Sequence, residues 1–223
     1  KLPFGIAQIG KAFRNEIAPR DFIFRSREFE QMEIEYFIDG NNREEQFEHW
    51  RKAMWRWMEL IGLDEKQVRE LEVPEEDRAH YSKRTIDFEF EFPFGKKELY
   101  GLAYRTAYDL KQHMEHSGVD LRYLDQQAGA QGNNRFLPHV IEPSLGVDRT
   151  VLAVLASAYQ EDELGGDTRV FLRLPTVLAP YKVAVFPLLK NKPPLVEKAR
   201  SVYQMLKREI PEVAFDDNGN VGK

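Results

Sequence analysis

Alternating apolar and polar residues predict several β-strands along the chain. In 86–92, Ile and three Phe alternate with acidic residues, and a Pro-Phe-Gly turn leads into a second strand at 98–105, so we expect a hairpin with one carboxylate-bearing face. Residues 2–14 contain two glycines and are expected to form a loop that leads into a strand. After a turn at 19–21, a further strand is expected over 24–38.

The strand expected at 24–38 separates its side chains by chemistry. Met32, Ile34 and Tyr36 fall on one face, which we assign to the core. The other face is polar apart from one aromatic ring, and a ring between arginines and carboxylates offers a stacking plane beside charges of both signs. The residues on this polar face are Arg25, Arg27, Phe29, Gln31, Glu33 and Glu35.

Apolar residues at helical spacing predict a long helix over about 43–61. Asn42 is expected to cap its start, with Glu45 three residues later completing a capping box. The residues that follow, 64–84, are mostly charged. They are expected to form a solvated insertion with a short helix at 64–71.

Two shorter helices are expected later in the chain, at 108–116 and 149–159. The second is apolar on nearly all sides, so we expect it to be buried. His113 and His116 lie one turn apart on the first, but no third ligand is evident nearby, and surface positions are the more common outcome for such a pair. A polar loop is expected at 125–137.

The end of the chain has a different pattern. A connector rich in proline is followed by a short apolar strand, an amphipathic helix and a second strand, which is the pattern of a βαβ unit. These segments are 175–180, 182–187, 194–209 and 213–215.

These elements predict an α+β fold. Residues 1–174 are expected to form an antiparallel sheet flanked by helices, with a helical insertion at about 41–84, and residues 175–223 begin a separate α/β domain. The chain has 223 residues, 42% of them hydrophobic, which is enough for a core of this size.

Composition narrows the class of protein. The chain has no cysteine, which excludes a disulfide framework or a thiolate metal site and fits a cytoplasmic location. No apolar run approaches the roughly 18 residues that span a bilayer, so no membrane partner is expected. The net charge of −5 argues against indiscriminate nucleic-acid binding, yet it is compatible with a local basic surface.

A basic cluster between positions 11 and 27 is the first candidate for chemistry. Arginine suits phosphate because its planar guanidinium donates two parallel hydrogen bonds and stays charged at any physiological pH. A solvated basic hairpin is the alternative interpretation, and it is the more common outcome for an arginine cluster taken alone. The cations of this cluster are Lys11, Arg14, Arg20, Arg25 and Arg27.

Two further positions point to the same kind of site. Arg149 lies in the first turn of a predicted helix, where the helix dipole disfavours a cation by roughly 0.3–1 kcal/mol, and a bound anion would explain its presence there. In the second strand of the predicted hairpin, Glu98 and Arg105 are an odd number of residues apart, so a regular strand would place their side chains on opposite faces. They can face a common site only if Gly101 marks a bulge or local twist.

Two strings resemble motifs of the class II aminoacyl-tRNA synthetases. FRNE at 13–16, followed by Arg25 and Phe29, is similar to motif 2, and EPS at 142–144, followed by Arg149, is similar to motif 3. Longer strings, PFGIAQIGKAFRNEIAPR, REFEQMEIEYF, HSGVDLRY and PHVIEPS, resemble the homodimeric glycyl-tRNA synthetases. No segment resembles motif 1, so the chain is expected to be the middle piece of a longer protein whose anticodon-binding domain begins after the catalytic domain.

The resemblance implies that ATP binds at the basic cluster. Arg14 and Arg149 would be the catalytic residues, with Arg14 on the α-phosphate and Arg149 on the γ-phosphate together with Arg25. Adenine would stack on Phe29. The remaining contacts implied are Glu16 for the adenine amino group, Arg20 for a phosphate or the end of the tRNA, and Glu98 near the phosphates.

The resemblance also implies a small glycine pocket, formed by Glu33, Arg105, Glu142 and Ser144. The carboxylates would attract the glycine ammonium group, and Arg105 would help to fix the site. Glu98 and Glu142 would be the ligands of Mg²⁺, which prefers carboxylate oxygen.

The function implied is ATP-dependent ligation of glycine to tRNA(Gly) through a glycyl-adenylate, by a homodimeric cytoplasmic enzyme. Two alternatives remain open at this point. One is a synthetase-like subunit that binds nucleic acid without catalysis, and the other is a class II ligase for another amino acid.

Overall fold

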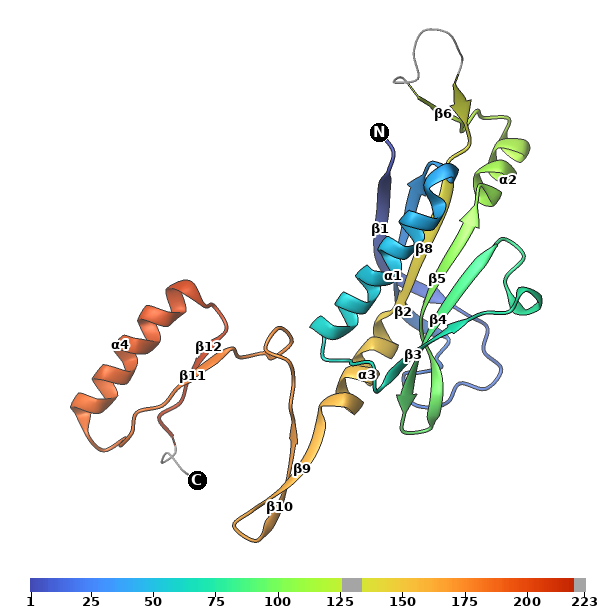
Figure 1. The fold of residues 1–223 in the computed structure, drawn as a ribbon. Helices are drawn as coiled ribbons and strands as arrows, with labels where there is room; N and C mark the ends of the chain where they lie inside the picture. The colour runs from blue at the N-terminus through green and yellow to red at the C-terminus, as the bar shows by residue number, and fades with distance from the viewer. Residues whose placement is uncertain (126–133, 219–223) are drawn as a thin grey trace. The chain divides into compact units, whose positions relative to one another are not determined.

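The computed structural model describes residues 1–125 and 134–218, so most of the polar loop expected at 125–137 lies outside the described residues. The chain divides into two compact units, Lys1–Leu172 and Arg173–Lys223 (Figure 1). Within the described residues, we find no helix that combines the length and the apolar character needed to cross a membrane.

The first unit is built on a six-stranded antiparallel sheet, with strand order β1-β2-β8-β5-β4-β3. This arrangement confirms the expected α+β class. Two-stranded pairings also occur outside this sheet. The strands of the large sheet are β1 (Phe4–Phe13), β2 (Glu28–Ile38), β3 (Val68–Glu72), β4 (Arg84–Phe92), β5 (Gly95–Thr106) and β8 (His139–Gly146).

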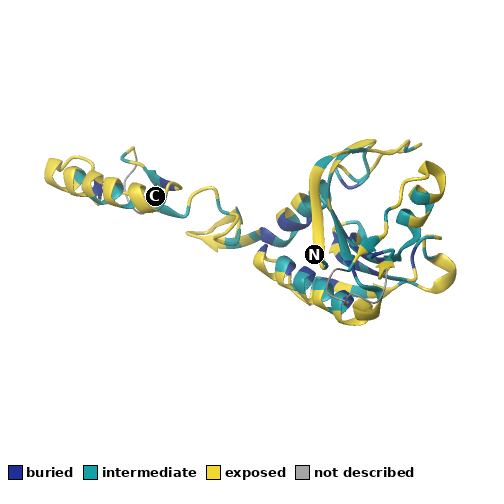
Figure 2. Cartoon of the chain, turned by 90° about the horizontal axis from the view of Figure 1, so that it is seen from above, coloured by how far each residue is buried: buried dark blue, intermediate teal, exposed yellow. Residues whose placement is uncertain are grey.

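Two helices, α1 (Arg43–Leu60) and α3 (Val147–Ala158), pack on one face of this sheet. The hydroxyl of Tyr100 on β5 joins both, because it lies 3.2 Å from Nε1 of Trp57 on α1 and 2.9 Å from Oγ1 of Thr150 on α3. The core lies between these helices and the sheet, as the burial colours in Figure 2 show. The other face of the sheet is therefore left for polar side chains.

Two expectations about the first strands were wrong. Residues 4–13 form a ten-residue strand rather than a loop, and apolar side chains on this edge strand, such as Ile6 and Ile9, are exposed, so the usual alternation of burial is absent. The next strand begins at Glu28 and not near residue 24, because Arg20 and Arg25 form an isolated bridge that closes the preceding turn.

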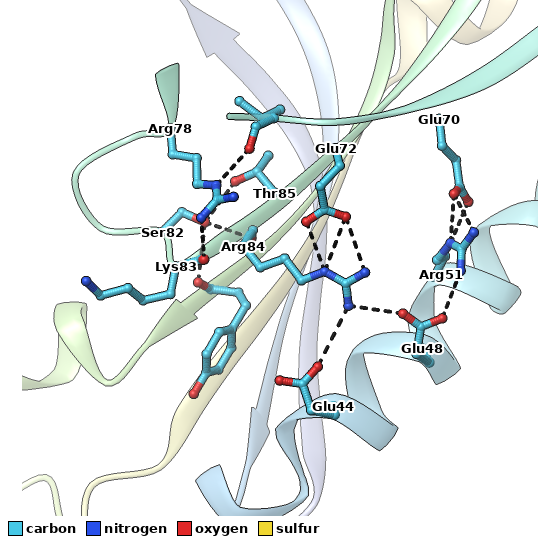
Figure 3. A network of polar contacts seen from close by, with 12 residues as sticks. Glu44, Glu48, Arg51, Glu70, Glu72, Arg78, Ser82, Lys83, Arg84 and Thr85 are labelled. Carbon is cyan, nitrogen blue, oxygen red and sulfur yellow. Dashed lines mark hydrogen bonds and ion pairs between the residues drawn. The ribbon is translucent and has the colours of Figure 1, made fainter. Parts of the chain in front are cut away.

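Most residues of the charged segment 64–84 are exposed, as expected of a solvated segment, but the helix expected at 64–71 is absent from the described structure. Its residues include the edge strand β3, in which Val68 is 3% exposed and pairs with Phe90 of β4. Its charges pair with neighbours: Glu70 accepts hydrogen bonds from Arg51 of α1 (Figure 3). Some of its charges therefore lie in cross-strand and helix-to-strand ion pairs.

Two details of the helices also differ from expectation. The capping box is absent from the start of α1, since Asn42 makes no side-chain cap; the carboxylate of Asp39 instead accepts from the backbone N–H of Asn41, in a short 3₁₀ turn, η1 (Gly40–Asn42). Helix α3 is only partly buried, and Val151 and Leu155 are exposed on its outer side.

The remaining elements complete the two units. Sequence patterns did not predict the hairpin of β9 and β10, whereas the parallel pairing of β11 with β12 around α4 confirms the expected βαβ unit. These elements are η2 (Glu75–Asp77), α2 (Tyr108–Ser117), β6 (Tyr123–Leu124), β7 (Arg135–Phe136), β9 (Tyr159–Leu164), β10 (Asp167–Leu172), β11 (Val183–Val185), α4 (Pro193–Glu209) and β12 (Val213–Phe215).

Candidate active site

Polar residues line up across the strands on the face opposite α1. Glu33 of β2 lies opposite Ser144 of β8, and Ser144 lies opposite Gly101 of β5. Glu142 lies opposite Ala103 in the same strand pair. Because alternate residues of a strand share a face, these positions lie together on the uncovered side of the sheet. Two very small residues thus adjoin carboxylate and hydroxyl groups.

A cavity at this face gathers most of the residues predicted to bind ATP. Its wall combines the loop between β1 and β2 with the start of α3, which are more than a hundred residues apart in sequence. Arg20 does not line it: its side chain is 63% exposed, and its Nε lies 3.6 Å from Asp21. The predicted site residues in the cavity wall are Arg14, Glu16, Arg25, Phe29, Glu98, Ser144 and Arg149.

Arg149 is fixed at the start of α3 by polar and aromatic contacts. Its Nη1 donates to the backbone oxygen of Glu98 at 2.9 Å and lies 3.3 Å from the Glu98 carboxylate. Its guanidinium carbon lies 4.4 Å from the ring centre of Phe24, which packs against Phe92 and Phe94. A cation held on a rigid ring at a helix N-terminus is well placed to meet an anion.

The loop between β1 and β2 positions two more arginines. The backbone N–H of Arg14 donates to the oxygen of Arg27, and Nε of Arg27 donates to the backbone oxygen of Glu16, both at 3.0 Å. The Arg14 guanidinium lies 5.4 Å from the ring centre of Phe29, and Nη1 of Arg25 lies 3.9 Å from the Glu16 carboxylate. These long contacts leave both cations weakly neutralised.

A bulge in β5 turns Glu98 toward the cavity. The register between β4 and β5 shifts at this point, so Leu99 is an extra residue between Glu98 and Tyr100. Leu99 and Tyr100 are each 1% exposed, which breaks the alternation of the strand. The prediction that Glu98 and Arg105 need a bulge to share a face is confirmed, but the bulge lies at Leu99 and not at Gly101.

Beyond the cavity, Arg105 is tightly held by two carboxylates, and we call Arg105, Asp109 and Glu142 the Arg105 cluster. Nη1 of Arg105 donates to Glu142 at 2.6 Å, while its Nε and Nη2 donate to the two oxygens of Asp109 at 2.8 and 3.0 Å. Burial alone would lower the pKa of Arg105. The hydrogen bonds to Asp109 and Glu142 together have the larger, opposite effect, so its pKa lies above the ordinary value. Arg105 is therefore a permanent, saturated cation.

Two glutamates of β2 extend the negative side of this cluster. Burial raises the pKa of Glu33, and the charge of Glu142 adds to the effect while Arg105 opposes it. The same two causes, burial first, raise the pKa of Glu35 to about 7. Carboxylates that repel one another in this way would be stabilised by an incoming ammonium group.

Sequence reasoning did not assign several polar residues that the structure brings to this face, among them Asp109 of the Arg105 cluster. Gln31 lines the cavity and donates from Nε2 to Oγ of Ser144 at 2.6 Å. Glu35 adjoins the Arg105 cluster, and burial together with Glu98 raises the pKa of Asp87 to about 6. The signal for Gln31 and Glu35 was present, since both share the polar face of β2 with Glu33.

The two residues predicted to bind Mg²⁺ have different surroundings. The Glu98 side chain lies in the cavity wall and is 52% exposed, whereas the Glu142 carboxylate accepts a hydrogen bond from Arg105. In the described parts of the chain, no group of three or more His, Cys, Asp or Glu residues is arranged to hold a metal ion.

Comparison with known proteins adds a family to this geometry. Residues 1–158 match the model of the tRNA synthetase class II core domain (G, H, P, S and T). The glycine–tRNA ligase of Clostridium tetani is 51% identical over 224 residues, which is 100% of this chain and 47% of that protein. Those of Caldanaerobacter subterraneus and Geobacillus thermodenitrificans are each 49% identical, over 100% of this chain and 47% and 46% of their own lengths.

The chain thus spans about half the length of the curated relatives that it matches. The matched region includes the whole sheet, the cavity and the Arg105 cluster. By this match, the chain belongs to the family of the class II tRNA synthetase core domain.

Proposed function

We propose that the protein to which this chain belongs activates glycine with ATP and transfers it to tRNA(Gly) through a glycyl-adenylate. One observation carries the proposal: on a single sheet face, a cavity with weakly neutralised arginines adjoins a cluster of carboxylates around a saturated arginine. The first suits a triphosphate, and the second suits a small amino acid with an ammonium group. The names of the relatives at 49–51% identity support glycine as that amino acid.

In the activation step, a carboxylate oxygen of glycine attacks the α-phosphorus of ATP. The bond from that phosphorus to the bridging oxygen breaks, and pyrophosphate leaves with the electron pair. The substrate brings its own nucleophile, so the protein contributes positioning and charge neutralisation. Arg14 would neutralise the α-phosphate, and Arg25 and Arg149 would hold the γ-phosphate. Phe29 would stack on adenine.

Glycine would be selected by exclusion. Glu33 and Glu142 would receive the ammonium group, and Ser144 lies beside them on the same face. The floor here is made by Gly101 and Ala103, so the α-carbon of glycine has room while a larger side chain would meet the carboxylates. A larger amino acid would also displace these carboxylates, and the repulsion between them would weaken its binding further.

Mg²⁺ would enter with ATP as part of the substrate and neutralise phosphate charge. Of the two predicted ligands, Glu98 is the one in the cavity wall, and an exposed carboxylate oxygen suits this ion. We propose Glu98 as its protein ligand, with Glu142 engaged mainly by Arg105.

The partners follow from the proposed reaction. We propose that tRNA(Gly) is the acceptor, that residues 175–223 begin the anticodon-binding domain, that the full-length protein is a homodimer, and that it acts in the cytoplasm, where tRNA is charged. Exposed apolar residues on the edge strand β1, among them Phe4, Ile6 and Ile9, support a partner surface along this edge.

The test is ATP–pyrophosphate exchange by the full-length protein, with each amino acid in turn and without tRNA. Exchange that depends on glycine, and that alanine and serine do not support, is the expected result. Exchange with a different amino acid would identify another class II ligase. Absence of exchange with every amino acid, together with retained tRNA binding, would identify a nucleic-acid-binding subunit without catalysis.

A further inference from the structure

The segment between β3 and β4 places an aromatic ring against the amino-acid side of the site. The guanidinium carbon of Arg105 lies 4.0 Å from the ring centre of Tyr81. Asp109 and Glu142 occupy edges of the same guanidinium group. The edges and the face of the Arg105 guanidinium group are therefore contacted by residues from three different elements: α2, β8 and the segment that carries Tyr81.

This segment is itself fixed by side-chain to backbone hydrogen bonds. Nε and Nη1 of Arg78 donate to the backbone oxygens of Val73 and Lys83, both at 2.8 Å, and so tie the two ends of the segment together (Figure 3). Ser82, which is 7% exposed, donates from Oγ to the backbone oxygen of Arg84 at 2.8 Å. Tyr81 lies between these anchors, so the backbone that carries its ring is held in place.

Further contacts tie the end of this segment to β3 and α1. Arg84, directly after the segment, donates to Glu72 of β3 and Glu48 of α1 at 3.0 Å (Figure 3). Its guanidinium carbon lies 4.2 Å from the ring centre of Phe47. The segment is thus bound to both β3 and α1. The backbone on both sides of Tyr81 is therefore fixed, as the support of a substrate-binding group requires.

The ring acts on Arg105 in a way that the carboxylates do not. Hydrogen bonds along the edges fix the in-plane direction of the guanidinium group, whereas a stacked ring fixes the tilt of its plane. If the plane tilts, Nη1 loses its alignment with Glu142, and the carboxylate that would receive the ammonium group moves with it. A small displacement of a substrate-binding group has a large effect on binding.

We propose that Tyr81 is a positioning residue for the amino-acid pocket: it holds the face of Arg105 so that Glu142 meets the substrate ammonium group at a fixed geometry. The proposal rests on the function proposed above. Tyr81 acts through its ring, because the ring makes the contact with Arg105, and its effect falls on the amino acid and not on ATP.

The test compares Tyr81→Leu, which removes the ring, with Tyr81→Phe, which keeps it, in glycine-dependent ATP–pyrophosphate exchange by the full-length protein. The Leu variant is expected to raise the KM for glycine roughly tenfold and to leave the KM for ATP within about twofold. The Phe variant is expected to remain within about twofold of wild type in both. Tyr123→Leu removes a half-buried tyrosine that contacts Phe136, away from Arg105, and serves as the matched control.

Equal rises in the KM for glycine and for ATP in the Leu variant would overturn the proposal, as would a Phe variant as impaired as the Leu variant. If Tyr81→Leu does not fold, Tyr81→Met, with a flexible side chain of similar length, replaces it under the same criteria. Crystal structures of wild type and variant provide a readout without activity: the guanidinium plane of Arg105 should tilt relative to Glu142 in the Leu variant, and an unmoved Arg105 would overturn the proposal. Absence of glycine-dependent exchange in wild type would refute the proposed function, and the structures alone would then decide the role of Tyr81.

Discussion

Arg14 and Arg25 of the cavity and Arg105 of the neighbouring cluster are held in opposite ways. Arg25 meets its closest carboxylate at 3.9 Å and Arg14 mainly faces a ring, whereas Arg105 donates to two carboxylates at 2.6–3.0 Å. A weakly neutralised cation gains much when an anion arrives, and a saturated cation gains little. The cavity arginines therefore suit a ligand that comes and goes, while Arg105 suits the orientation of its neighbours.

The largest expected effect comes from removing Arg149, the cavity arginine at the start of α3. Arg149→Ala should lower the rate of glycine-dependent exchange by about 100-fold or more, because a fixed cation at the developing phosphate charge is lost. The fold should survive, since the contacts of this side chain, with Phe24 and Glu98, lie in the cavity wall and not between the helices and the sheet. Circular dichroism would check the fold, and Arg169→Ala on the exposed face of β10 is the control. A wild-type exchange rate would refute the role of Arg149.

The next prediction concerns the carboxylates of the Arg105 cluster. Glu142→Gln should raise the KM for glycine by about 50-fold and change the KM for ATP little, because it removes a charge from the carboxylate cluster and not from the cavity. Glu163→Gln, at an exposed carboxylate of β9 that accepts from Thr168, is the matched control. If both KM values rise together, the two sides of the site are not separable in the way that the contacts indicate.

A third experiment measures how the ionisation of Glu35, beside the Arg105 cluster, changes the free energy of unfolding. Burial, Glu142, Asp109 and Glu33 raise the pKa of Glu35 to about 7 against the lowering effect of Arg105, while its unfolded-state value is 4.5. The folded protein thus binds this proton more tightly, so the stability that it contributes is complete below about pH 4.5 and is lost as the pH rises to about 7. Glu35→Gln should remove this loss and gain on the order of 1–2 kcal/mol over wild type at pH 8.

Urea unfolding of both proteins at pH 5 and pH 8 checks this prediction. The difference in the free energy of unfolding should be small at the lower pH and larger at the higher one. A difference that is the same at both pH values would show that the substitution acts through packing and not through the proton.

The smallest expected effect defines the edge of the cavity. Arg20→Ala should lower glycine-dependent exchange by at most about threefold, because this side chain lies outside the cavity wall and is largely exposed. Aminoacylation of tRNA(Gly) under the same conditions separates the two roles considered for Arg20. A much larger fall in exchange would place Arg20 on a phosphate, and a selective fall in aminoacylation would place it at the tRNA end.

Local pattern was enough to predict the elements with strong periodicity. The alternation in β4 and the helical spacing in α1 each reflect a single buried face, so both elements could be identified without knowledge of their neighbours. The polar face of β2 was predicted in the same way, and it holds Phe29, Gln31, Glu33 and Glu35 as expected from parity.

Other features depended on contacts that a sequence does not display. The charges of β3 suggested solvent because their partners, such as Arg51, lie on a helix that precedes the strand in the chain. The edge strand β1 lacked a buried face altogether. The contact of the Tyr81 ring with Arg105, 24 positions later, could not be predicted, because no local pattern shows that these two parts of the chain meet.

The bulge at Leu99 makes the end of this hairpin sensitive to chain length as well as to residue type. If β5 paired with β4 without this bulge, Leu99 would take the polar face and Glu98 would turn toward the core and leave the cavity, although every residue would still be present. In this strand, the count of residues carries information that no substitution can replace.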